Sequence, residues 1–259
     1  MLTLRIALRY LLSKKTHNAV NVISLISVTG VAVATMAIVC VLSVFNGFTD
    51  LATAKISQLA PDLRIEASRG KVILRADSVA DAARGIGGVT AATPVLEEHA
   101  LAIYDGLQMP VMMKGVGNDF SSVTDIDAIV KEDGAFLLSD SLYGDFATLS
   151  VGAAIQLQAH PGFAYSFTLN VPRRVGRINP SNPAASFRND SLLVGGVFQT
   201  EQAEFDTDLV IVPLSTARHL LEYDTEASAI ELKVNDGTDI HAVADALKKA
   251  LGSGYAVKD

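Results

Sequence analysis

Histidine, cysteine and carboxylate side chains are the groups in this chain that could bind a metal or move protons. The only cysteine, Cys40, lies inside a long apolar run and has no second thiol beside it. No histidine pair has the spacing of H-E-x-x-H or of another zinc site. We therefore expect no metal site in this chain. The five histidines are His17, His99, His160, His219 and His241.

Two pairs of neighbouring acids, Glu97 with Glu98 and Asp206 with Asp208, are candidates for general acid–base chemistry, but we interpret them as solvated strand ends. Nucleotide-binding loops are also missing from the sequence. The glycines of "GVGNDF" at 115–120 lack the third glycine of G-x-G-x-x-G, and neither a G-x-x-x-x-G-K-[ST] loop nor a G-x-S-x-G elbow occurs. We expect a chain that is not an enzyme and binds no cofactor itself.

A proline-rich segment, Pro172 to Asp190, gathers positive charge in a chain whose net charge is −7. It is long for a loop, since the median is about 4–6 residues. Its prolines reduce the entropy lost when such a loop becomes ordered on binding. The functional interpretation is a loop that docks a partner, and the alternative is a surface loop that covers its own domain. The predicted partner-binding residues are Pro172, Arg173, Arg174, Arg177, Ile178 and Pro180, and Arg188 adds a further positive charge.

The N-terminal region combines a basic segment with an uncharged one. Residues 1–17 contain four basic residues and no acid, and Thr16 to Thr49 contains no Asp, Glu, Lys or Arg. A helix crosses the roughly 30 Å hydrocarbon core with about 20 apolar residues. We predict a transmembrane helix over residues 18–49. The alternative is a signal peptide cleaved near Ala34, but a signal has an apolar region of only about 7–15 residues.

The first seventeen residues favour a separate helix on the cytoplasmic side. Leu4, Leu8 and Leu11 alternate with Arg5 and Arg9 at helical spacing, which is typical of an amphipathic helix on an anionic membrane surface. The alternative is that this segment simply starts the span. Because the basic flank precedes the span, the N-terminus should be cytoplasmic, and about 210 residues should lie outside the cytoplasm.

The exported part is acidic and has no cysteine, which excludes disulfides and gives no support for nucleic-acid binding. Apolar alternation, turn residues and helix caps predict an α+β fold. We expect strands at 62–67, 71–75, 96–104, 108–116, 134–139, 154–159, 167–171, 191–198, 209–214 and 229–234. We expect helices at 78–84 with Ser78 as the cap, at 139–147, at 215–223, and at 239–251 with a cap at Thr238 or Asp239.

The order of these elements favours a discontinuous domain. Residues 50–117 and 201–259 would form one α/β lobe, and residues 118–200 would form an inserted, mostly β lobe that carries the long loop 172–190.

Several sequence strings resemble the N-terminal part of lipoprotein-releasing-system permeases, which are transmembrane subunits of bacterial ABC transporters in the macrolide-exporter superfamily. The resemblance is most specific in "RIALRYLLSK", in "NVISLISVTGVAVATMAIVCVLSVFNGF" and in "PDLRI". It continues through "QMPVMMKGV", "VGGVF" and "DLVIVPLSTARHLLEY", so that it covers nearly the whole chain.

This resemblance implies a bacterial inner-membrane permease with one N-terminal span and a periplasmic domain made of a porter-like lobe and an inserted lobe. Three C-terminal spans are expected in such a permease but are absent from this sequence, so the chain resembles an N-terminal fragment. The implied partners are a second permease subunit in a homo- or heterodimer, a cytoplasmic ATPase dimer that binds ATP and Mg, a lipoprotein substrate, and a periplasmic carrier. In known members a hook loop recruits the carrier, and Pro172–Asp190 falls in the corresponding region but is longer than the hook we would expect.

The resemblance also places the substrate path along the first span. Lipid-modified substrate would enter at its periplasmic end, where Val44, Phe45, Asn46 and Phe48 lie. An aromatic pair at the membrane interface is the alternative interpretation of Phe45 and Phe48. Small residues at Ser27, Gly30 and Ala34 have the spacing that lets a second membrane helix approach closely.

Three alternatives to a lipoprotein-releasing permease stay open. One is a permease of the same superfamily that works by mechanotransmission in efflux or other envelope processes. Another is a complete adaptor anchored by a single span. The last is a membrane-tethered enzyme, for which the sequence offers no catalytic set.

Overall fold

The computed structural model of this chain describes residues 18–56, 58–131, 133–174 and 186–258. It divides into two units, residues 1–54 and 55–259, which are described separately. The predicted amphipathic helix at 1–17 lies outside the described residues.

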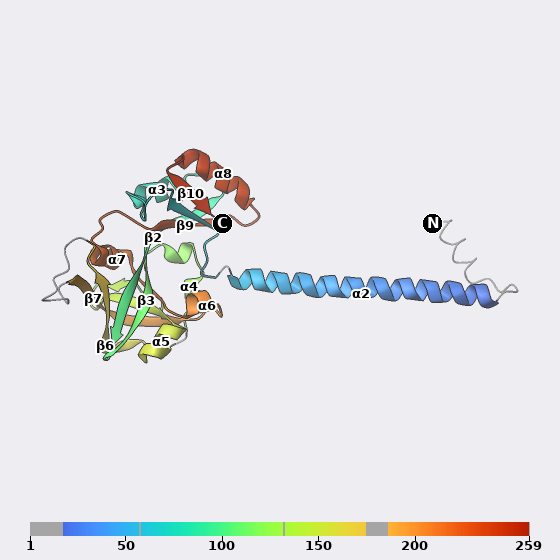
Figure 1. Ribbon diagram of the computed structural model, residues 1–259, viewed down its shortest axis with the longest axis horizontal. Coiled ribbons are helices and arrows are strands. Elements are labelled where there is room, and N and C mark those ends of the chain that lie inside the picture. Colours follow the sequence, from blue (N-terminus) through green and yellow to red (C-terminus); the bar gives the residue numbers. More distant parts are fainter. Residues whose placement is uncertain (1–17, 57, 132, 175–185, 259) are drawn as a thin grey trace. The chain divides into compact units, whose positions relative to one another are not determined.

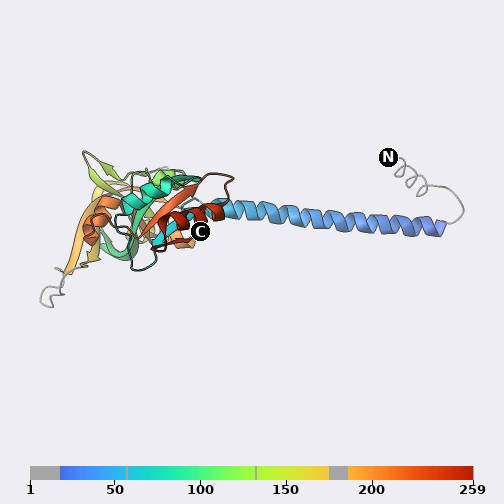
Figure 2. The same cartoon turned by 90° about the horizontal axis from the view of Figure 1, so that it is seen from above.

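The first unit is dominated by one uninterrupted helix, α2, which runs from Asn18 to Ile56 (Figure 1, Figure 2). Within it, Val22–Thr49 is apolar enough to cross a membrane, and none of its most apolar window is buried inside the protein. At 1.5 Å per residue these 28 residues span about 42 Å, which exceeds the roughly 30 Å of a hydrocarbon core. The helix predicted at 18–49 is therefore present and continues for two further turns.

The second unit is a mixed α/β domain, and the predicted α+β class is confirmed. Its strands are β1 (Leu63–Ala67), β2 (Val89–Tyr104), β3 (Leu107–Val116), β4 (Ser139–Asp140), β5 (Gly144–Ser150), β6 (Gly162–Pro172), β7 (Phe187–Phe198), β8 (Leu209–Pro213), β9 (Ala229–Val234) and β10 (Tyr255–Lys258). Its helices are α3 (Ala76–Arg84), the 3₁₀ turn η1 (Phe120–Ser122), α4 (Ile126–Ile129), α5 (Val151–Leu157), α6 (Ala203–Asp206), α7 (Leu214–Leu221) and α8 (Ile240–Leu251).

Nine of the strands follow each other in the order β10-β1-β9-β2-β3-β8-β5-β7-β6, and β4 pairs with β5. β6 also pairs with β2. The six strands β2, β3, β8, β5, β7 and β6 therefore form a closed ring. The largest core cluster lies among these strands and beneath α5 and α7, with Phe167, Leu149 and Met113 among its fully buried members.

A second core forms where β10, β1, β9 and the first half of β2 meet α3 and α8 (Figure 1). Its fully buried residues include Ile65, Ile230 and Leu247. A third cluster around Phe120 and Phe198 includes residues of η1, α4 and β8. The lobe boundaries at 117/118 and 200/201 stay a prediction.

Several local predictions are confirmed. Asp105 and Gly106 form the turn between β2 and β3, and both have positive φ, as such a hairpin requires. Asp239 caps α8, because its side chain accepts a hydrogen bond from the His241 N–H, and the helix ends at Gly252. Pro110 lies where β3 pairs only with β2, since the pairing of β3 with β8 begins at Met112.

Two predicted strands and one cap are wrong. The segment 71–75 makes only an isolated bridge between Ile73 and Ala227, and α3 begins directly after Arg75, which has φ 51°. Ser78 therefore lies inside that helix and does not cap it. The segment 134–139 has no strand before Ser139.

Two short elements have the opposite type from the prediction. The segment predicted as a strand at 154–159 belongs mostly to α5, which Ser150 caps by accepting from the Ala153 N–H. The helix predicted at 139–147 is instead the β4–β5 hairpin. There the Asp140 carboxylate accepts hydrogen bonds from the backbone of Leu142 and Tyr143, and this local turn competes with helix formation.

Candidate functional site

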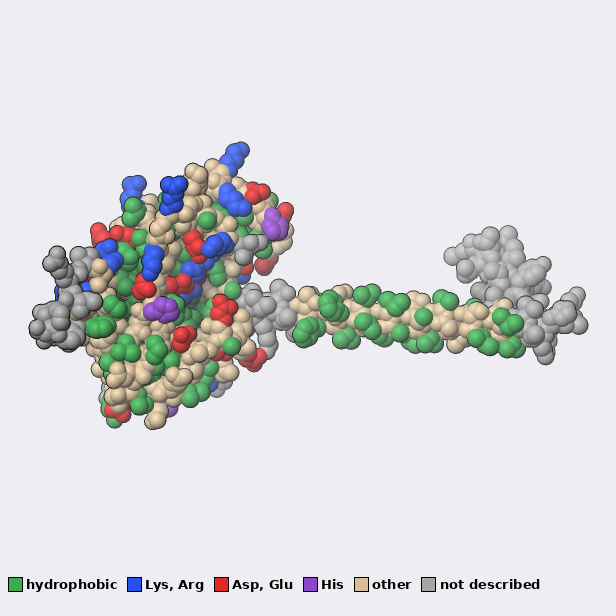
Figure 3. All heavy atoms as spheres, viewed as in Figure 1, with side chains coloured by type: hydrophobic (Ala, Val, Ile, Leu, Met, Phe, Trp, Pro, Cys, Tyr) green, Lys and Arg blue, Asp and Glu red, His purple; other side chains and the backbone are tan. Residues whose placement is uncertain are grey.

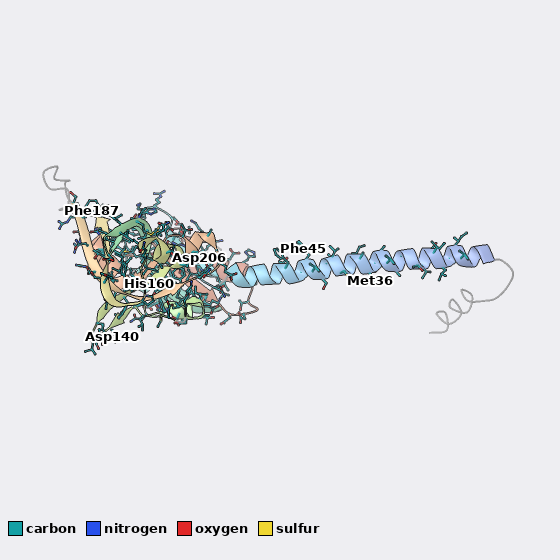
Figure 4. All side chains as sticks on the ribbon, turned by 90° about the horizontal axis from the view of Figure 1, so that it is seen from below. Met36, Phe45, Asp140, His160, Phe187 and Asp206 are labelled. Atoms are coloured by element: carbon teal, nitrogen blue, oxygen red, sulfur yellow. The ribbon has the colours of Figure 1, made fainter. Side chains whose placement is uncertain are left out.

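The four residues predicted to meet substrate lie near the C-terminal end of the apolar part of α2. Val44, Phe45 and Phe48 are 73%, 65% and 69% exposed, and Asn46 is exposed as well. Figure 4 shows Phe45 on the side of the helix opposite to Met36. Large apolar side chains on an isolated helix need lipid or another protein around them.

Some polar side chains of α2 form hydrogen bonds within the helix. The Ser27 hydroxyl donates to the Ile23 carbonyl at 2.9 Å, and the Thr35 hydroxyl donates to the Val31 carbonyl at 2.8 Å. Such bonds let a polar side chain stay in an apolar medium without an unsatisfied donor. A Cβ added at Gly30 would meet nothing within 4 Å, so the helix has open space there.

Two of the predicted substrate residues on α2 share one face of the helix with the predicted packing residues. Phe45 follows Ser27, and Phe48 follows Gly30, by five turns at about 3.6 residues per turn. A membrane helix that packed against Ser27 and Gly30 would therefore lie on the side where Phe45 and Phe48 project. This alignment links the predicted packing site with the predicted substrate site.

The predicted partner-binding loop is described only at its base. Pro172 ends β6, and Arg173 and Arg174 follow it with exposed side chains. Arg177, Ile178 and Pro180 lie outside the described residues.

The described arginines of this region contact the domain itself. Arg174 donates to the carbonyl oxygens of Leu221 and Glu222, at 3.3 and 3.0 Å, and its guanidinium lies 4.6 Å from the centre of the Tyr223 ring. Arg188 donates to Glu222 Oε1 at 3.0 Å, and its Nη2 lies 2.9 Å from His219 Nε2. These contacts support the alternative that the base of the loop covers its own domain. Arg173, by contrast, is exposed, and its backbone N–H donates to the Ser186 carbonyl.

A row of charged side chains, which we call the ionic ladder, crosses five neighbouring strands of the domain. It consists of Lys258 on β10, Glu66 and Arg64 on β1, Glu231 on β9, Glu97 on β2 and Lys114 on β3. Strand register sets these pairs, because Arg64 lies opposite Glu231 and Glu97 lies opposite Lys114. Space-filling Figure 3 shows cationic and acidic side chains interleaved on one face of the domain.

Glu231 is the centre of the ladder. Lys114 Nζ donates to Glu231 Oε1 at 2.7 Å, and Arg64 Nη1 donates to the same oxygen at 3.0 Å. Arg64 also donates to Glu97, whose Oε1 lies 3.6 Å from Lys114 Nζ. Glu231 is fully buried, and its Oε2 has no hydrogen-bond partner among the described residues. Two cations thus converge on one carboxylate oxygen and leave the other one unpaired.

The outer members of the ladder are held in their charged forms. Burial raises the pKa of Glu97, but the hydrogen bond from Arg64 and the charge of Lys114 outweigh it, and the net result is a lowered pKa. A hydrogen bond from Lys258 lowers the pKa of Glu66. Burial alone would lower the pKa of Arg64. The carboxylates of Glu97, Glu231 and Glu66 outweigh this effect, and the net result is a raised pKa. Glu97 is therefore an ion-paired residue in the middle of β2, and the prediction of a solvated strand end is wrong for it.

The ladder forms part of the lining of a cleft of about 760 Å³. Further charged residues and a set of apolar side chains complete its wall, and the apolar ones include Leu59, Leu96, Met112, Phe205 and Tyr223. A volume of roughly 300–1,000 Å³ is typical of ligand sites.

No single stretch of the sequence indicates this cleft. Arg64 and Glu231 are 167 positions apart, and each lies in a strand whose alternation looks like an ordinary solvent-facing pattern. The signal that was present is a charged residue in each of the strands β1, β2, β3 and β9, and sheet order is needed to bring these residues together.

The remaining candidate residues form no further site. Asp206, the last residue of α6, accepts hydrogen bonds from the Thr200 backbone N–H and hydroxyl, which tie the end of this helix to the segment before it. Within the described part of the chain, no group of three or more His, Cys, Asp and Glu residues could hold a metal ion. Cys40 is a free thiol on the exposed surface of α2.

Comparison with known proteins gives a family and two similar folds. The family model described as "MacB-like periplasmic core domain" matches residues 24–250, from within α2 to within α8. The crystal structure of the extracellular domain of the noncanonic ABC-type transporter YknZ from Gram-positive bacteria is 13% identical. Its TM-score is 0.52, and the match covers 76% of this chain and 99% of that one.

The periplasmic region of MacB from Actinobacillus actinomycetemcomitans is also 13% identical. Its TM-score is 0.51, and the match covers 76% of this chain and 87% of that one. No curated protein sequence matches this chain. At such low identity the two structures support the fold of the domain.

Proposed function

Because this chain belongs to the family of the MacB-like periplasmic core domain, we propose that it is part of an ABC-transporter permease that releases lipoproteins from the bacterial inner membrane. In this proposal α2 anchors the subunit with its N-terminus in the cytoplasm, and the domain after it works in the periplasm. A separate ATPase dimer hydrolyses ATP, and a second permease subunit completes the membrane part. A soluble periplasmic carrier receives the lipoprotein.

The observation that carries the proposal is a single chain in which an apolar helix leads into a MacB-like domain. The family match begins at residue 24, inside α2, so the helix belongs to the same module as the domain. The resemblance of "SVFNGF" and its neighbours to lipoprotein-releasing permeases favours lipoprotein as the substrate. The shared face of Phe45, Phe48, Ser27 and Gly30 supports a substrate path beside a helix–helix contact.

Efflux is the second candidate function. The family description and the fold similarity to the MacB periplasmic region favour it. In that case the permease would transmit the work of the ATPase to the periplasmic side, and no lipoprotein would pass along α2.

A photo-crosslinking amino acid at Phe45, in the assembled transporter in native membranes, separates the two candidates. We expect an adduct with lipoprotein that decreases when ATP is supplied. The matched control is Ser43, which lies at the same depth but about 160° around the helix from Phe45. An active transporter without any lipoprotein adduct at Phe45 argues for efflux, and equal adducts at both positions indicate ordinary lipid-facing surface.

A further inference from the structure

The cleft above the ionic ladder carries more negative than positive charge. Six carboxylates contribute to its lining: Glu66, Glu97, Glu98, Glu204, Asp208 and Glu231. The cations of the lining are Arg64, Lys71 and Lys114, so the formal balance of the lining is three negative charges with His99 neutral. A cleft with one sign of charge and low-dielectric walls concentrates ligands of the opposite sign.

Every cation of the lining already has an acidic partner. Arg64 pairs with Glu66, Glu97 and Glu231. Lys114 pairs with Glu231 at 2.7 Å, and Lys71 Nζ lies 3.5 Å from Glu98. An anionic ligand would therefore have to displace an existing ion pair.

Some of the acidic groups, by contrast, have no cation beside them. Glu204 is exposed and Asp208 is half-buried, and neither forms a salt bridge with a described residue. Glu231 also contributes to the lining, but it is fully buried and already pairs with Arg64 and Lys114. Glu204 and Asp208 are therefore the carboxylates of the lining without a cationic partner among the described residues, and they favour an added positive charge.

The wall beside these two acids is apolar. Met112, Phe205 and Leu209 line the cleft next to the two acids, and Phe205 and Asp208 belong to or follow α6. A ligand that fits both parts has a cationic end and an apolar body.

We propose that this cleft is a binding site for a protonated amine attached to an apolar body. The ammonium group binds beside Glu204 and Asp208, and the body packs against Met112, Phe205 and Leu209. The inference goes beyond the proposed function, because it concerns binding to the domain and not what the transporter moves. Binding is measured without ATP or partner subunits, so its failure leaves lipoprotein release untouched, and the reverse also holds.

The test uses the whole chain in nanodiscs of zwitterionic lipid with methyl-labelled methionine. The chain has five methionines, and Met112 lines the cleft, whereas Met109 is buried in the ring core and Met36 lies on α2. The probe is 4-phenylbutylamine, and 4-phenylbutyrate is the matched anion. We expect the Met112 resonance, assigned with Met112→Leu, to shift and saturate with the amine, while the butyrate has no effect.

A pair of charge-removing variants locates the cationic end. Glu204→Gln combined with Asp208→Asn should weaken amine binding about fivefold, in line with the loss of two partly exposed charge contacts. The matched control is Asp236→Asn with Asp245→Asn, which removes two carboxylates outside the cleft lining and should leave the affinity unchanged.

Three results would overturn the proposal: no saturable shift of Met112, equal shifts with amine and butyrate, or equal affinities of the two double variants. A shift confined to Met36 reports entry of the amine into lipid and also counts against the cleft. An unchanged resonance of the buried Met113 in the variants shows that the fold is intact. The single variant Glu204→Gln changes only an exposed position and should weaken amine binding less than the double variant does.

Discussion

The ionic ladder and the base of the 172–190 loop both pair arginine with glutamate, but at different depths. Arg64 and Arg188 are equally exposed, each at 26% of the side chain. Their partners differ, because Glu231 is fully buried whereas Glu222 is 25% exposed. The burial of the partner, and not the exposure of the arginine itself, therefore sets the free-energy cost of breaking each pair.

The largest expected effect comes from removing one cation of the ladder. Lys114→Met leaves the buried Glu231 with Arg64 alone and should lower the free energy of unfolding by about 3 kcal/mol. Arg188→Met, at the loop base, should lower it by less than about 1 kcal/mol. Urea unfolding in detergent, followed by tyrosine fluorescence, measures both, since the chain has six tyrosines and no tryptophan. Equal losses would contradict the distinction by depth.

A double variant sharpens this result. Lys114→Met with Glu231→Leu removes the buried acid as well and should recover most of the loss, because no uncompensated buried charge remains. If the double variant is as unstable as the sum of the two single ones, the loss reflects packing around Lys114 and Phe120 instead of charge.

The next effect is on acid stability. The pKa of Glu97 is lowered in the folded protein, so its contribution to stability is present above the ordinary glutamate value of about 4.3 and is lost as the pH falls through the folded value. Glu97→Gln should therefore be less stable than the wild type at pH 7 and should lose less stability between pH 6 and pH 3. Parallel losses in the two proteins would show that Glu97 does not govern the acid transition.

Glu226, near the loop, provides the comparison for this experiment. Backbone hydrogen bonds, chiefly from the Asp224 N–H, lower its pKa, and its side chain is partly exposed. Glu226→Gln should change the acid slope less than Glu97→Gln does, because solvent screens the exposed carboxylate.

A smaller effect is expected at Arg174. Arg174→Ala removes two hydrogen bonds to backbone carbonyls and the contact with the Tyr223 ring, and should cost about 1 kcal/mol. Thermal unfolding of the full chain measures this loss. A cost near zero would mean that the base of the loop is not fixed to α7.

The smallest effect on stability is expected at Arg173. Arg173→Glu should change the free energy of unfolding by less than about 0.5 kcal/mol, because this side chain is exposed. If the loop docks a carrier as proposed, the same variant should weaken carrier pull-down. Arg174→Ala is the control, since a loss in both variants points to the shape of the loop and not to the charge at 173.

Long, regular signals in the sequence were sufficient for much of the fold. The uncharged run of α2, the Asp105-Gly106 turn, the strict alternation of β9 and the capped helix α8 are each specified by neighbouring residues. Short elements were not predictable in this way. α5 has only seven residues, and burial of Ala153, Ala154 and Leu157 against the ring determines its type.

The two candidate sites also differ in how close their residues are in sequence. The arginines at 173–188 are near each other in sequence, which suggested a binding loop, yet Arg174 and Arg188 contact their own domain. The ladder residues are scattered over β1, β2, β3, β9 and β10, and only strand register makes them neighbours. Residues that are neighbours in sequence therefore suggested a partner-binding role for the loop. The ladder residues are far apart in sequence, so the ladder could not be predicted.

The length of β2 has a mechanical consequence for the domain. Its first part, from Val89 to Val95, pairs with β9, and its second part, from Val95 to Tyr104, pairs with β3. The backbone of β2 is therefore continuous between the part of the sheet that contains β9 and the part that contains β3. A hinge between the two parts near Val95 would therefore have to break interstrand hydrogen bonds of β2 with β9 or with β3.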